Sequence, residues 1–293
     1  MTRIIISDEM ENEVVERIKQ LGEVVYLPAN LNEAIANADV LIVRSKTKVT
    51  AELLAHAHKL KIVARGGVGL DNVDVKACEA RHINVLNTPG ASANAVAELV
   101  LGHMFSCFRN IAKAHHQMKN KIWDKKSLTG QEIEGKTLGV IGYGRIGALV
   151  GKKASALGMK IISYNPPPRY EDEIVRFVGL DELLAHADVI TLHVPSTPET
   201  KNMINSSTIA KMKKGVFIIN TARGDIIDEN ALYEGCKSGK IAAAALDVFP
   251  QEPYTGKLLE LDNVFFTPHL GAATKEAQGR IGDELVKLLK EAV

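Results

Sequence analysis

The chain has 293 residues, of which 46% are hydrophobic and 24% charged, with a formal net charge of +1 at pH 7. This length suits one large or two medium domains, and the near-neutral charge gives no reason to expect nucleic acid or a membrane surface as a partner. The three cysteines, Cys78, Cys107 and Cys236, lack metal-ligand spacing and are odd in number, which favours a reducing compartment over a disulfide framework. The first apolar run is too short for a signal peptide and no stretch approaches a membrane span, so we expect a cytoplasmic protein.

Short apolar runs alternate with helical patterns over the first third of the chain. We predict strands at Arg3–Ile6, Glu23–Leu27, Val40–Val43, Lys61–Ala64 and Ile83–Leu86, with helices near 9–20, 50–58 and 74–81. This alternation predicts a parallel sheet with crossover helices. In such sheets, ligands bind beyond the carboxyl ends of the strands.

Two of these strand ends carry residues suited to an anion. Val43 is followed by the basic segment Arg44-Ser45-Lys46-Thr47-Lys48, and Ala64 by the glycine-rich turn Arg65-Gly66-Gly67-Val68-Gly69, whose N–H groups could face an anion. Taken alone, the first segment is equally a solvated basic loop and the second a tight turn. Their placement at neighbouring strand ends favours an anion pocket.

A turn at 87–90 precedes a long helical pattern that is predicted to run from Ser92 to His116 and to link the two halves of the chain. His103, His115 and His116 lie on or near this helix, but no carboxylate or cysteine stands at metal-ligand spacing from them. We therefore interpret them as structural or solvated residues and expect no metal site. Residues 119–136 have no regular pattern.

The most informative stretch surrounds the glycine-rich turn Gly142-Tyr-Gly-Arg-Ile-Gly147. An apolar strand at 137–141 precedes it, a helical pattern follows it as far as Gly158, and a second strand at 159–164 comes next. Gly142 permits a sharp turn, Gly144 leaves room for a pyrophosphate, and Gly147 allows close helix–strand packing. The surrounding β-α-β context predicts a dinucleotide site at the helix N-terminus.

The residue after the second strand departs from the usual pattern. An acidic side chain that would hold the adenosine ribose hydroxyls is expected there, but the residue is Asn165, followed by three prolines and Arg169. An amide can bond a ribose but does not repel a 2′-phosphate, and Arg169 could attract one. The sequence favours NAD and leaves NADP open.

The β-α alternation resumes in the second half of the chain. Strands are predicted at 188–193, 216–220, 241–246 and 263–266, and an amphipathic helix is predicted near 275–291. Arg223, Glu252 and His269 follow three of these strands and fall on the sheet edge that holds the dinucleotide. An arginine can clamp a carboxylate, a histidine can exchange a hydroxyl proton, and a carboxylate can orient the imidazole. With a nicotinamide, this set would interconvert a 2-hydroxy acid and its 2-oxo acid.

The sequence resembles the D-2-hydroxyacid dehydrogenase family along nearly the whole chain. The likeness is carried by the stretch from Gly66 through Asn84–Glu98, by GYGRIG, and by the segments NTARGDIIDENAL, ALDVFPQEP and TPHLGAATKEAQ. Within the family, the segments VRSKTKVT, RGGVGLDNVD and HLGAATKEAQ are most similar to the phosphoglycerate dehydrogenases.

The resemblance implies a role for each candidate residue. Arg223 would bind the substrate carboxylate, His269 would be the acid/base and Glu252 its partner, while Asp247 would contact the nicotinamide carboxamide. The implied substrate pocket consists of Arg44, Ser45, Arg65, Gly66, Gly67, Arg223 and His269. The implied cofactor contacts are Gly142, Gly144, Arg145, Ile146, Gly147, Asn165, His193, Val194, Pro195, Thr200, Thr221, Ala222, Arg223, Asp247, His269, Gly271 and Ala272.

The family resemblance also implies an α/β fold with two doubly wound parallel-sheet domains. Residues 93–270 would form a Rossmann-type cofactor domain, and residues 1–92 with 271–293 a discontinuous, flavodoxin-like substrate domain. The active site would lie in the cleft between them, and the protein would be a homodimer through its cofactor domain. We expect no C-terminal regulatory domain, and hence no serine inhibition through one.

Three functions stay open at this point. The favoured one is the NAD-dependent interconversion of 3-phosphoglycerate and 3-phosphohydroxypyruvate, the first step of serine biosynthesis, because Arg44 and Arg65 suit a phosphate. An alternative is a glyoxylate or hydroxypyruvate reductase that uses NAD(P)H. A non-enzymatic NAD-sensing scaffold is disfavoured, since it would not need Arg223, Glu252 and His269.

Overall fold

The computed structural model describes residues 1–165 and 173–292, and the chain divides into two compact units. Unit 1 comprises Met1–Ala93 and Ala272–Val293, and unit 2 comprises Asn94–Gly271. Each division lies one residue beyond the boundary expected from the sequence. Within the described residues, no helix is both long and apolar enough to cross a membrane.

Unit 1 is built on a five-stranded parallel sheet with the strand order β2-β1-β3-β4-β5. This order is that of flavodoxin-like sheets, as the sequence analysis expected. The strands are β1 (Arg3–Ile6), β2 (Glu23–Tyr26), β3 (Val40–Val43), β4 (Ile62–Arg65) and β5 (Asn84–Asn87), and the helices are α1 (Asn12–Lys19), α2 (Leu31–Ile35), α3 (Ala51–Ala55), α4 (Val75–Ala80) and α11 (Lys275–Ala292).

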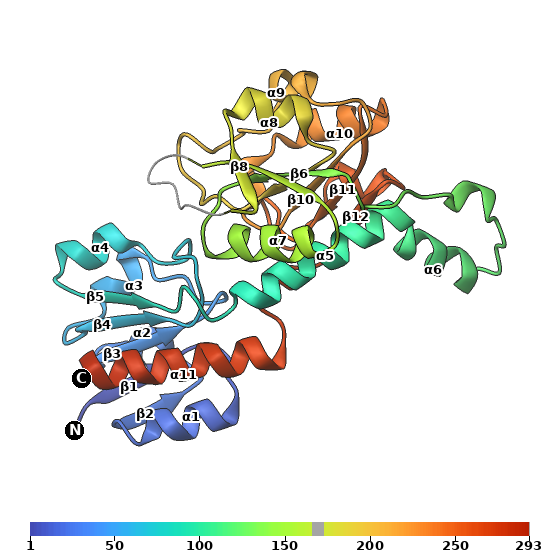
Figure 1. The fold of residues 1–293 in the computed structure, drawn as a ribbon. Coiled ribbons are helices and arrows are strands. Elements are labelled where there is room, and N and C mark those ends of the chain that lie inside the picture. The colour runs from blue at the N-terminus through green and yellow to red at the C-terminus, as the bar shows by residue number, and fades with distance from the viewer. Residues whose placement is uncertain (166–172, 293) are drawn as a thin grey trace. The chain divides into compact units, whose positions relative to one another are not determined.

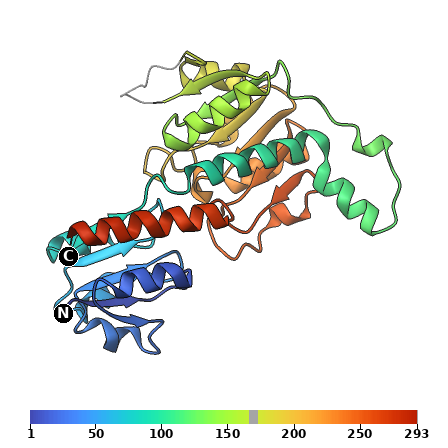
Figure 2. The same cartoon turned by 60° about the horizontal axis from the view of Figure 1, so that its bottom comes forward.

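Helices cover both faces of this sheet, because successive strand side chains point to opposite faces. Ile4 and Ile6 pack against α1 and α11, and Ile5 packs on the opposite face with α2, α3 and α4. Helix α11 runs beside α1 although it is distant in sequence (Figure 2). An ideal Cβ on Gly282 would lie 2.2 Å from Val14 Cγ2, so these two helices are packed as closely as a glycine allows.

Unit 2 has a seven-stranded parallel sheet with the order β12-β11-β10-β9-β6-β7-β8. Helices α8, α9 and α10 cover one face, and α5 and α7 cover the other (Figure 1). The strands are β6 (Thr137–Ile141), β7 (Lys160–Tyr164), β8 (Val175–Phe177), β9 (Val189–Leu192), β10 (Val216–Asn220), β11 (Ile241–Leu246) and β12 (Val264–Phe266). The helices are α5 (Ala93–Arg109), α6 (Ile111–Lys119), α7 (Arg145–Ala156), α8 (Leu180–His186), α9 (Ser206–Lys211) and α10 (Glu229–Lys237), with short 3-10 turns at Lys126–Leu128, Gly224–Ile226 and Lys257–Glu260.

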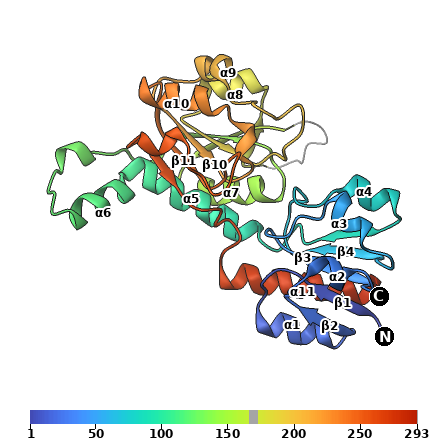
Figure 3. The ribbon, with the colours of Figure 1, turned by 180° about the vertical axis from the view of Figure 1, so that it is seen from behind.

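The expected continuous helix from 92 to 116 is wrong. It breaks at Asn110, which adopts a left-handed conformation with φ of 53°. Asparagine tolerates this conformation better than most residues. Helix α6 and the chain that follows it extend away from the sheet of unit 2 as an arm, residues 110–130 (Figure 3).

Each sheet has one topological switch point, where the order of strands reverses. It lies between β1 and β3 in unit 1 and between β6 and β9 in unit 2. Ligands of open α/β sheets bind in the crevice at such points, beyond the carboxyl ends of the strands. Asp8 and Arg44 follow the two strands of the first switch point, and Gly142 and His193 follow those of the second.

Candidate active site

The glycine-rich turn after β6 is shaped by two close approaches. Gly142 has a φ of +95°, and an ideal Cβ there would lie 2.6 Å from the carbonyl oxygen of His193. An ideal Cβ on Gly147 would lie 2.1 Å from the carbonyl oxygen of Gly142. Packing within the protein therefore requires both glycines, as the fingerprint predicts.

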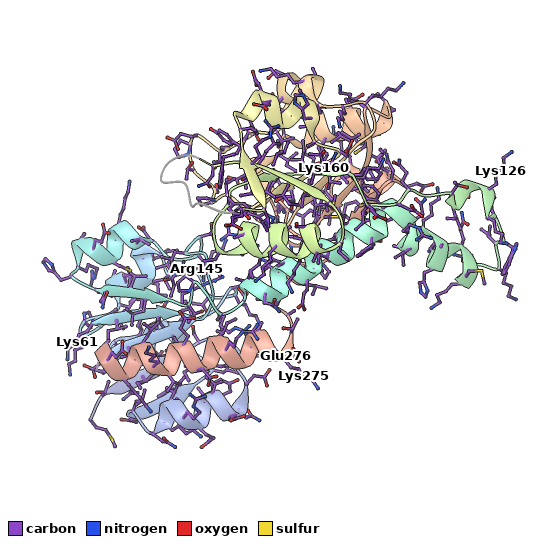
Figure 4. The ribbon with its side chains drawn as sticks, viewed as in Figure 1. Lys61, Lys126, Arg145, Lys160, Lys275 and Glu276 are labelled. Atoms are coloured by element: carbon purple, nitrogen blue, oxygen red, sulfur yellow. The ribbon has the colours of Figure 1, made fainter. Side chains whose placement is uncertain are left out.

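Gly144 differs from these two because none of the described residues occupies the place where its side chain would stand. An ideal Cβ there meets no heavy atom within 4 Å, and Gly144 is the N-cap of α7 without a side-chain cap. The first turn of α7 carries no acidic residue, and Arg145 stands at its start, exposed to solvent (Figure 4). An uncapped helix N-terminus with open space before it fits the pyrophosphate of a dinucleotide. The side chain of Ile146 is partly buried and packs against the core of unit 2.

Asn165 joins the end of β7 to the glycine-rich turn. Its Oδ1 accepts a hydrogen bond from the backbone N–H of Tyr143 at 3.0 Å. Tyr143 is buried and meets Phe177 edge to face, with ring centroids 5.4 Å apart. Arg169, the other residue expected to bear on the choice of cofactor, lies outside the described residues.

The loop after β9 lies on the other side of the switch point between β6 and β9, opposite the glycine-rich turn. His193 Nε2 lies 2.9 Å from Thr191 Oγ1, and burial lowers the pKa of His193 to about 3, so the ring is neutral at neutral pH. The side chain of Val194 lies where a side chain on Gly142 would project, so the two residues are in close contact. Thr200 Oγ1 donates to the carbonyl oxygen of Pro195 at 2.6 Å and holds the loop in a closed turn.

The turn that carries Arg223 is braced by Asn220, a buried residue that the sequence analysis missed. Asn220 Nδ2 donates to the carbonyl oxygen of Arg223 at 2.7 Å, and Asn220 Oδ1 accepts from the N–H of Ala222 at 3.0 Å. Arg223 Nη1 donates to the carbonyl oxygen of Ala222 at 2.6 Å. The buried hydroxyl of Thr221 has no hydrogen-bond partner among the described residues, which fits a hydrogen bond to a ligand.

The structure brings Glu252 and His269 together. His269 Nδ1 lies 2.9 Å from Glu252 Oε2, while Glu252 Oε1 accepts from the N–H of Phe249 at 3.1 Å. An ideal Cβ on Gly224 would lie 2.0 Å from the carbonyl carbon of Phe249, so the Arg223 turn packs directly on the segment that leads to Glu252. Because Glu252 holds Nδ1, the opposite nitrogen of the imidazole, Nε2, is left to exchange a proton.

Asp247 anchors the loop that carries His269. Its carboxylate is fully buried and accepts from the N–H of Leu270 at 2.7 Å, the N–H of Gly271 at 2.9 Å and the hydroxyl of Thr267 at 2.5 Å. Its carbonyl oxygen accepts from the N–H of His269 at 2.9 Å. Both carboxylate oxygens thus hold the loop. The family resemblance implied a nicotinamide contact for Asp247 and did not predict this structural role.

The basic loop after β3 is held by a buried carboxylate that the sequence analysis also missed. Asp8 accepts from the N–H groups of Arg44 at 2.6 Å, Lys46 at 3.1 Å and Thr47 at 3.0 Å. Asn72 Nδ2 donates to the carbonyl oxygens of Arg44 at 2.8 Å and Thr47 at 2.6 Å. The main chain of this loop is therefore fixed from both sides, and the neighbouring residue Ser45 is exposed.

The two glycines after β4 lie against the side chains of Arg65 and Arg44. An ideal Cβ on Gly67 would lie 1.9 Å from Arg65 Nη1, and one on Gly66 would lie 3.5 Å from Arg44 Cγ. The N–H of Gly66 donates to the carbonyl oxygen of Val43 and that of Gly67 to the carbonyl oxygen of Arg65, both at 2.9 Å. The expectation that these two N–H groups face an anion is thus wrong, because they bond within the protein.

The remaining residues singled out from the sequence are Ala272 and three histidines. Ala272 falls in unit 1, where its carbonyl oxygen accepts from Gln278 Nε2 at 2.6 Å. His115 and His116 are exposed on the arm, and His103 is buried. No group of three or more histidine, cysteine or acidic residues in the described ranges is placed to hold a metal.

Comparisons with known proteins assign the family. Residues 101–271 match the model of the D-isomer specific 2-hydroxyacid dehydrogenase NAD-binding domain. A hydroxypyruvate reductase of Thermotoga maritima is 50% identical over 299 residues, which cover 99% of this chain and 98% of that protein. A D-3-phosphoglycerate dehydrogenase of Methanocaldococcus jannaschii is 46% identical over the whole of this chain, which spans 58% of that protein's length.

A solved structure has the same architecture. D-lactate dehydrogenase from Aquifex aeolicus, complexed with NAD and lactic acid, superposes with a TM-score of 0.88 at 32% identity, covering 99% of this chain and 95% of the other. The family model and the close relatives cover both the glycine-rich turn and the Arg223, Glu252 and His269 segments. The chain therefore belongs to the D-isomer specific 2-hydroxyacid dehydrogenase family and is an NAD-binding oxidoreductase.

Proposed function

We propose that this protein interconverts 3-phosphoglycerate and 3-phosphohydroxypyruvate with NAD, the first step of serine biosynthesis. The observation that carries the proposal is that Arg44 and Arg65 stand at the carboxyl ends of β3 and β4, which are neighbours in the sheet. Guanidinium groups suit a phosphate, since each offers a planar fork of N–H donors. The relative from Methanocaldococcus jannaschii, which bears the name of this activity, supports the same substrate.

The residues of unit 2 supply the groups that act at the 2-hydroxy or 2-oxo carbon. Arg223 binds the substrate carboxylate through charge-assisted hydrogen bonds. His269 Nε2 takes the hydroxyl proton when the 2-hydroxy acid is oxidised and returns it when the 2-oxo acid is reduced. Glu252 holds Nδ1 and so fixes which ring nitrogen faces the substrate.

The residues around Gly144 fit the pyrophosphate of the dinucleotide, and Asn165 stands where its adenosine ribose would bind. When bound, NAD accepts or donates the hydride. Thr221, with its buried and unpartnered hydroxyl, and Asp247, at the carboxyl ends of β10 and β11, complete the cofactor side of the site.

The test is a set of initial rates with 3-phosphohydroxypyruvate, hydroxypyruvate and glyoxylate, each with NADH and with NADPH. Fast turnover of the phosphorylated acid with NADH is the expected result. A preference for either unphosphorylated acid would overturn the substrate assignment and reduce Arg44 and Arg65 to surface charges. A preference for NADPH would make Asn165 and Arg169 the residues to substitute next.

A hydroxypyruvate reductase is the second candidate, and one specific observation favours it. The Thermotoga maritima relative of that name is 50% identical, and this chain matches 98% of its length. Hydroxypyruvate has no phosphate, so an enzyme of this kind would gain little from the arginine pair. The ratio of the two rates in the panel above separates the candidates.

We further propose that the protein is a homodimer through its cofactor domain, with the arm of unit 2 as the interface. No residue of α6 is buried, and the arm exposes the large apolar side chains Ile111, Met118, Ile122 and Trp123 to between 49% and 75%. Lys126 lies at the outer end of the arm (Figure 4). An apolar surface of this kind is more often an interface than a solvated face. Light scattering of the unmodified protein and of Trp123→Ser tests it: a monomer in both would refute the proposal.

A further inference from the structure

A buried chain of hydrogen bonds connects helix α5 to the loop that carries His269. His103, which is 5% exposed, projects from α5 so that its Nε2 lies 3.1 Å from Thr267 Oγ1. Thr267 Oγ1 lies 2.5 Å from Asp247 Oδ1, and Asp247 is 0% exposed. All three residues belong to unit 2, and none of them has a place in the proton transfer proposed above.

The positions of the protons in this chain follow from the chemistry of each group. A carboxylate only accepts, so the single hydroxyl proton of Thr267 is donated to Asp247. Thr267 Oγ1 must then accept from His103, which places a proton on Nε2 of the ring. Burial lowers the pKa of His103, although the charge of Asp247 opposes this, and the neutral ring with Nε2 protonated is the form that fits.

The far end of the chain of bonds sets the conformation of His269. The Asp247 carboxylate binds the N–H groups of Leu270 and Gly271, the two residues that follow His269. His269 itself has a φ of +55°, a left-handed conformation that is uncommon for residues other than glycine. Rotation of this carboxylate would break both of these hydrogen bonds together, and the hydrogen bond from the Thr267 hydroxyl opposes that rotation.

We propose that His103 is a positioning residue for the reaction: it orients the Thr267 hydroxyl, which locks the Asp247 carboxylate and thereby the His269 loop. The proposal rests on the proton-transfer role of His269 proposed above. It requires only an N–H donor at the position of Nε2, so a glutamine, whose side-chain amide reaches a similar point, replaces the histidine.

The test uses four variants of the full chain: His103→Leu, His103→Gln, Thr267→Val and the double variant His103→Leu with Thr267→Val. His186→Leu, an exposed histidine on α8 of the same unit, is the matched control. With NADH and 3-phosphohydroxypyruvate or glyoxylate, His103→Leu should lower kcat about tenfold and leave KM within about twofold, because the loss falls on the reacting geometry. His103→Gln should keep most of the activity, and the control all of it.

The double variant gives the sharpest result. If His103 acts through Thr267, the double variant loses no more kcat than either single variant. Additive losses, a His103→Gln variant as slow as His103→Leu, or unchanged kcat in His103→Leu would each overturn the proposal. Should His103→Leu not fold, Thr267→Val and His103→Gln carry the comparison, with a loss expected in the first and not in the second.

A second measurement does not depend on turnover. In protein labelled with ¹⁵N-histidine, the ring signals of His269 should shift or broaden in Thr267→Val and His103→Leu, and match the unmodified protein in His103→Gln. Identical His269 signals in all variants would overturn the positioning role. If the unmodified protein reduces neither acid, the substrate assignment fails, and these spectra alone decide whether His103 positions the loop.

Discussion

The two switch points of this molecule occupy the same topological place and are used in opposite ways. In unit 2, the crevice between β6 and β9 has a glycine, Gly144, facing open space at the uncapped N-terminus of α7. In unit 1, the crevice between β1 and β3 is filled by a carboxylate of the protein itself, because Asp8 accepts the N–H groups of Arg44, Lys46 and Thr47.

The difference shows that a strand end becomes a binding site for an anion only if its N–H groups are not already used. The main chain at the start of α7 could hold the proposed pyrophosphate, because none of the described residues takes its place. The main chain of unit 1 cannot, and an anion bound there has to be recognised by side chains such as Arg44 and Arg65. With the proposed function, main-chain groups would hold an anion in unit 2 and guanidinium groups would hold one in unit 1.

The proton transfer proposed for His269 lies in unit 2, and the largest effect is expected from His269→Asn. Asparagine tolerates the left-handed backbone conformation of this position but does not titrate. We expect kcat to fall about 10²–10⁴-fold, the usual contribution of a general acid or base. Steady-state kinetics measure this loss, and NADH fluorescence titration should show nearly unchanged cofactor binding. A loss of kcat below about tenfold would contradict the role.

Alanine at two glycines of the turn after β6 should have different effects, one on stability and the other on NADH binding. Gly142→Ala places a Cβ 2.6 Å from a carbonyl oxygen at a φ of +95°, and should lower the free energy of unfolding by about 2–4 kcal/mol.

Gly144→Ala meets no atom of the described residues and should change the free energy of unfolding by less than about 0.5 kcal/mol. Gly144→Ala should instead weaken cofactor binding. We expect the Kd for NADH to rise about tenfold, which is a loss of about 1.4 kcal/mol of binding free energy. Urea unfolding and NADH titration test both; undiminished NADH binding by Gly144→Ala would show that the pyrophosphate binds elsewhere.

The guanidinium site of unit 1 is tested by Arg44→Ala. Removing a charge-assisted contact costs about 1.5–3 kcal/mol, so kcat/KM for 3-phosphohydroxypyruvate should fall about 10–100-fold. The value for glyoxylate, which has no phosphate, should change little. Lys46→Ala in the same loop is the matched control, because its side chain is exposed. Equal losses for the two acids would count against a phosphate contact.

Asp8→Asn alters the carboxylate that fills the first switch point. An amide offers one oxygen where the loop presents several N–H donors, so we expect the free energy of unfolding to fall by about 1–2 kcal/mol. The displaced Arg44 should raise KM for the phosphorylated acid and leave kcat nearly unchanged. Glu9→Gln, at an exposed neighbour, should do neither. If Asp8→Asn lowered kcat with KM unchanged, the assignment of unit 1 to substrate binding would be wrong.

The smallest effect concerns pH. Burial lowers the pKa of His193, beside the second switch point, to about 3, so the folded protein binds fewer protons than the unfolded chain between pH 3 and pH 6.5. Stability is therefore lost as the pH falls below about 6.5, by about 1 kcal/mol between pH 6.5 and 5.5. His103, with its pKa lowered by burial, acts in the same direction. Urea unfolding of His193→Asn should show a shallower pH dependence, and an unchanged slope would contradict the neutral ring.

Much of the fold was predictable because its signals are local. The apolar runs place every predicted strand within a residue or two of the observed one, and the spacing of Gly142, Gly144 and Gly147 identifies the turn without any tertiary information. The break in the long helix at Asn110 was not predictable from the pattern. Ile111 continues the apolar periodicity of α5, and only the structure shows its side chain to be 53% exposed.

The candidate reactive residues could be singled out from the sequence, and the residues that hold them could not. His269, Glu252 and Arg223 are chemically distinctive and follow predicted strands. Asp8 and Asn220 act through hydrogen bonds to backbone groups, and their neighbours in sequence do not distinguish them from solvated residues. Glu9 stands next to Asp8 and is exposed, while Asp8 is 3% exposed. Which of two adjacent acids turns inward depends on where the loop after β3 lies, a contact 36 to 39 residues away.

The return of α11 to unit 1 has a consequence for how the protein is made. One face of the first sheet, including Ile4 and Ile6, is covered in part by Leu285, Val286 and Leu289. A ribosome delivers these residues only after the whole of unit 2 has been synthesised. The nascent chain therefore carries an incomplete core of unit 1 while unit 2 folds. Unit 1 is begun first in synthesis, but its core is completed only after that of unit 2.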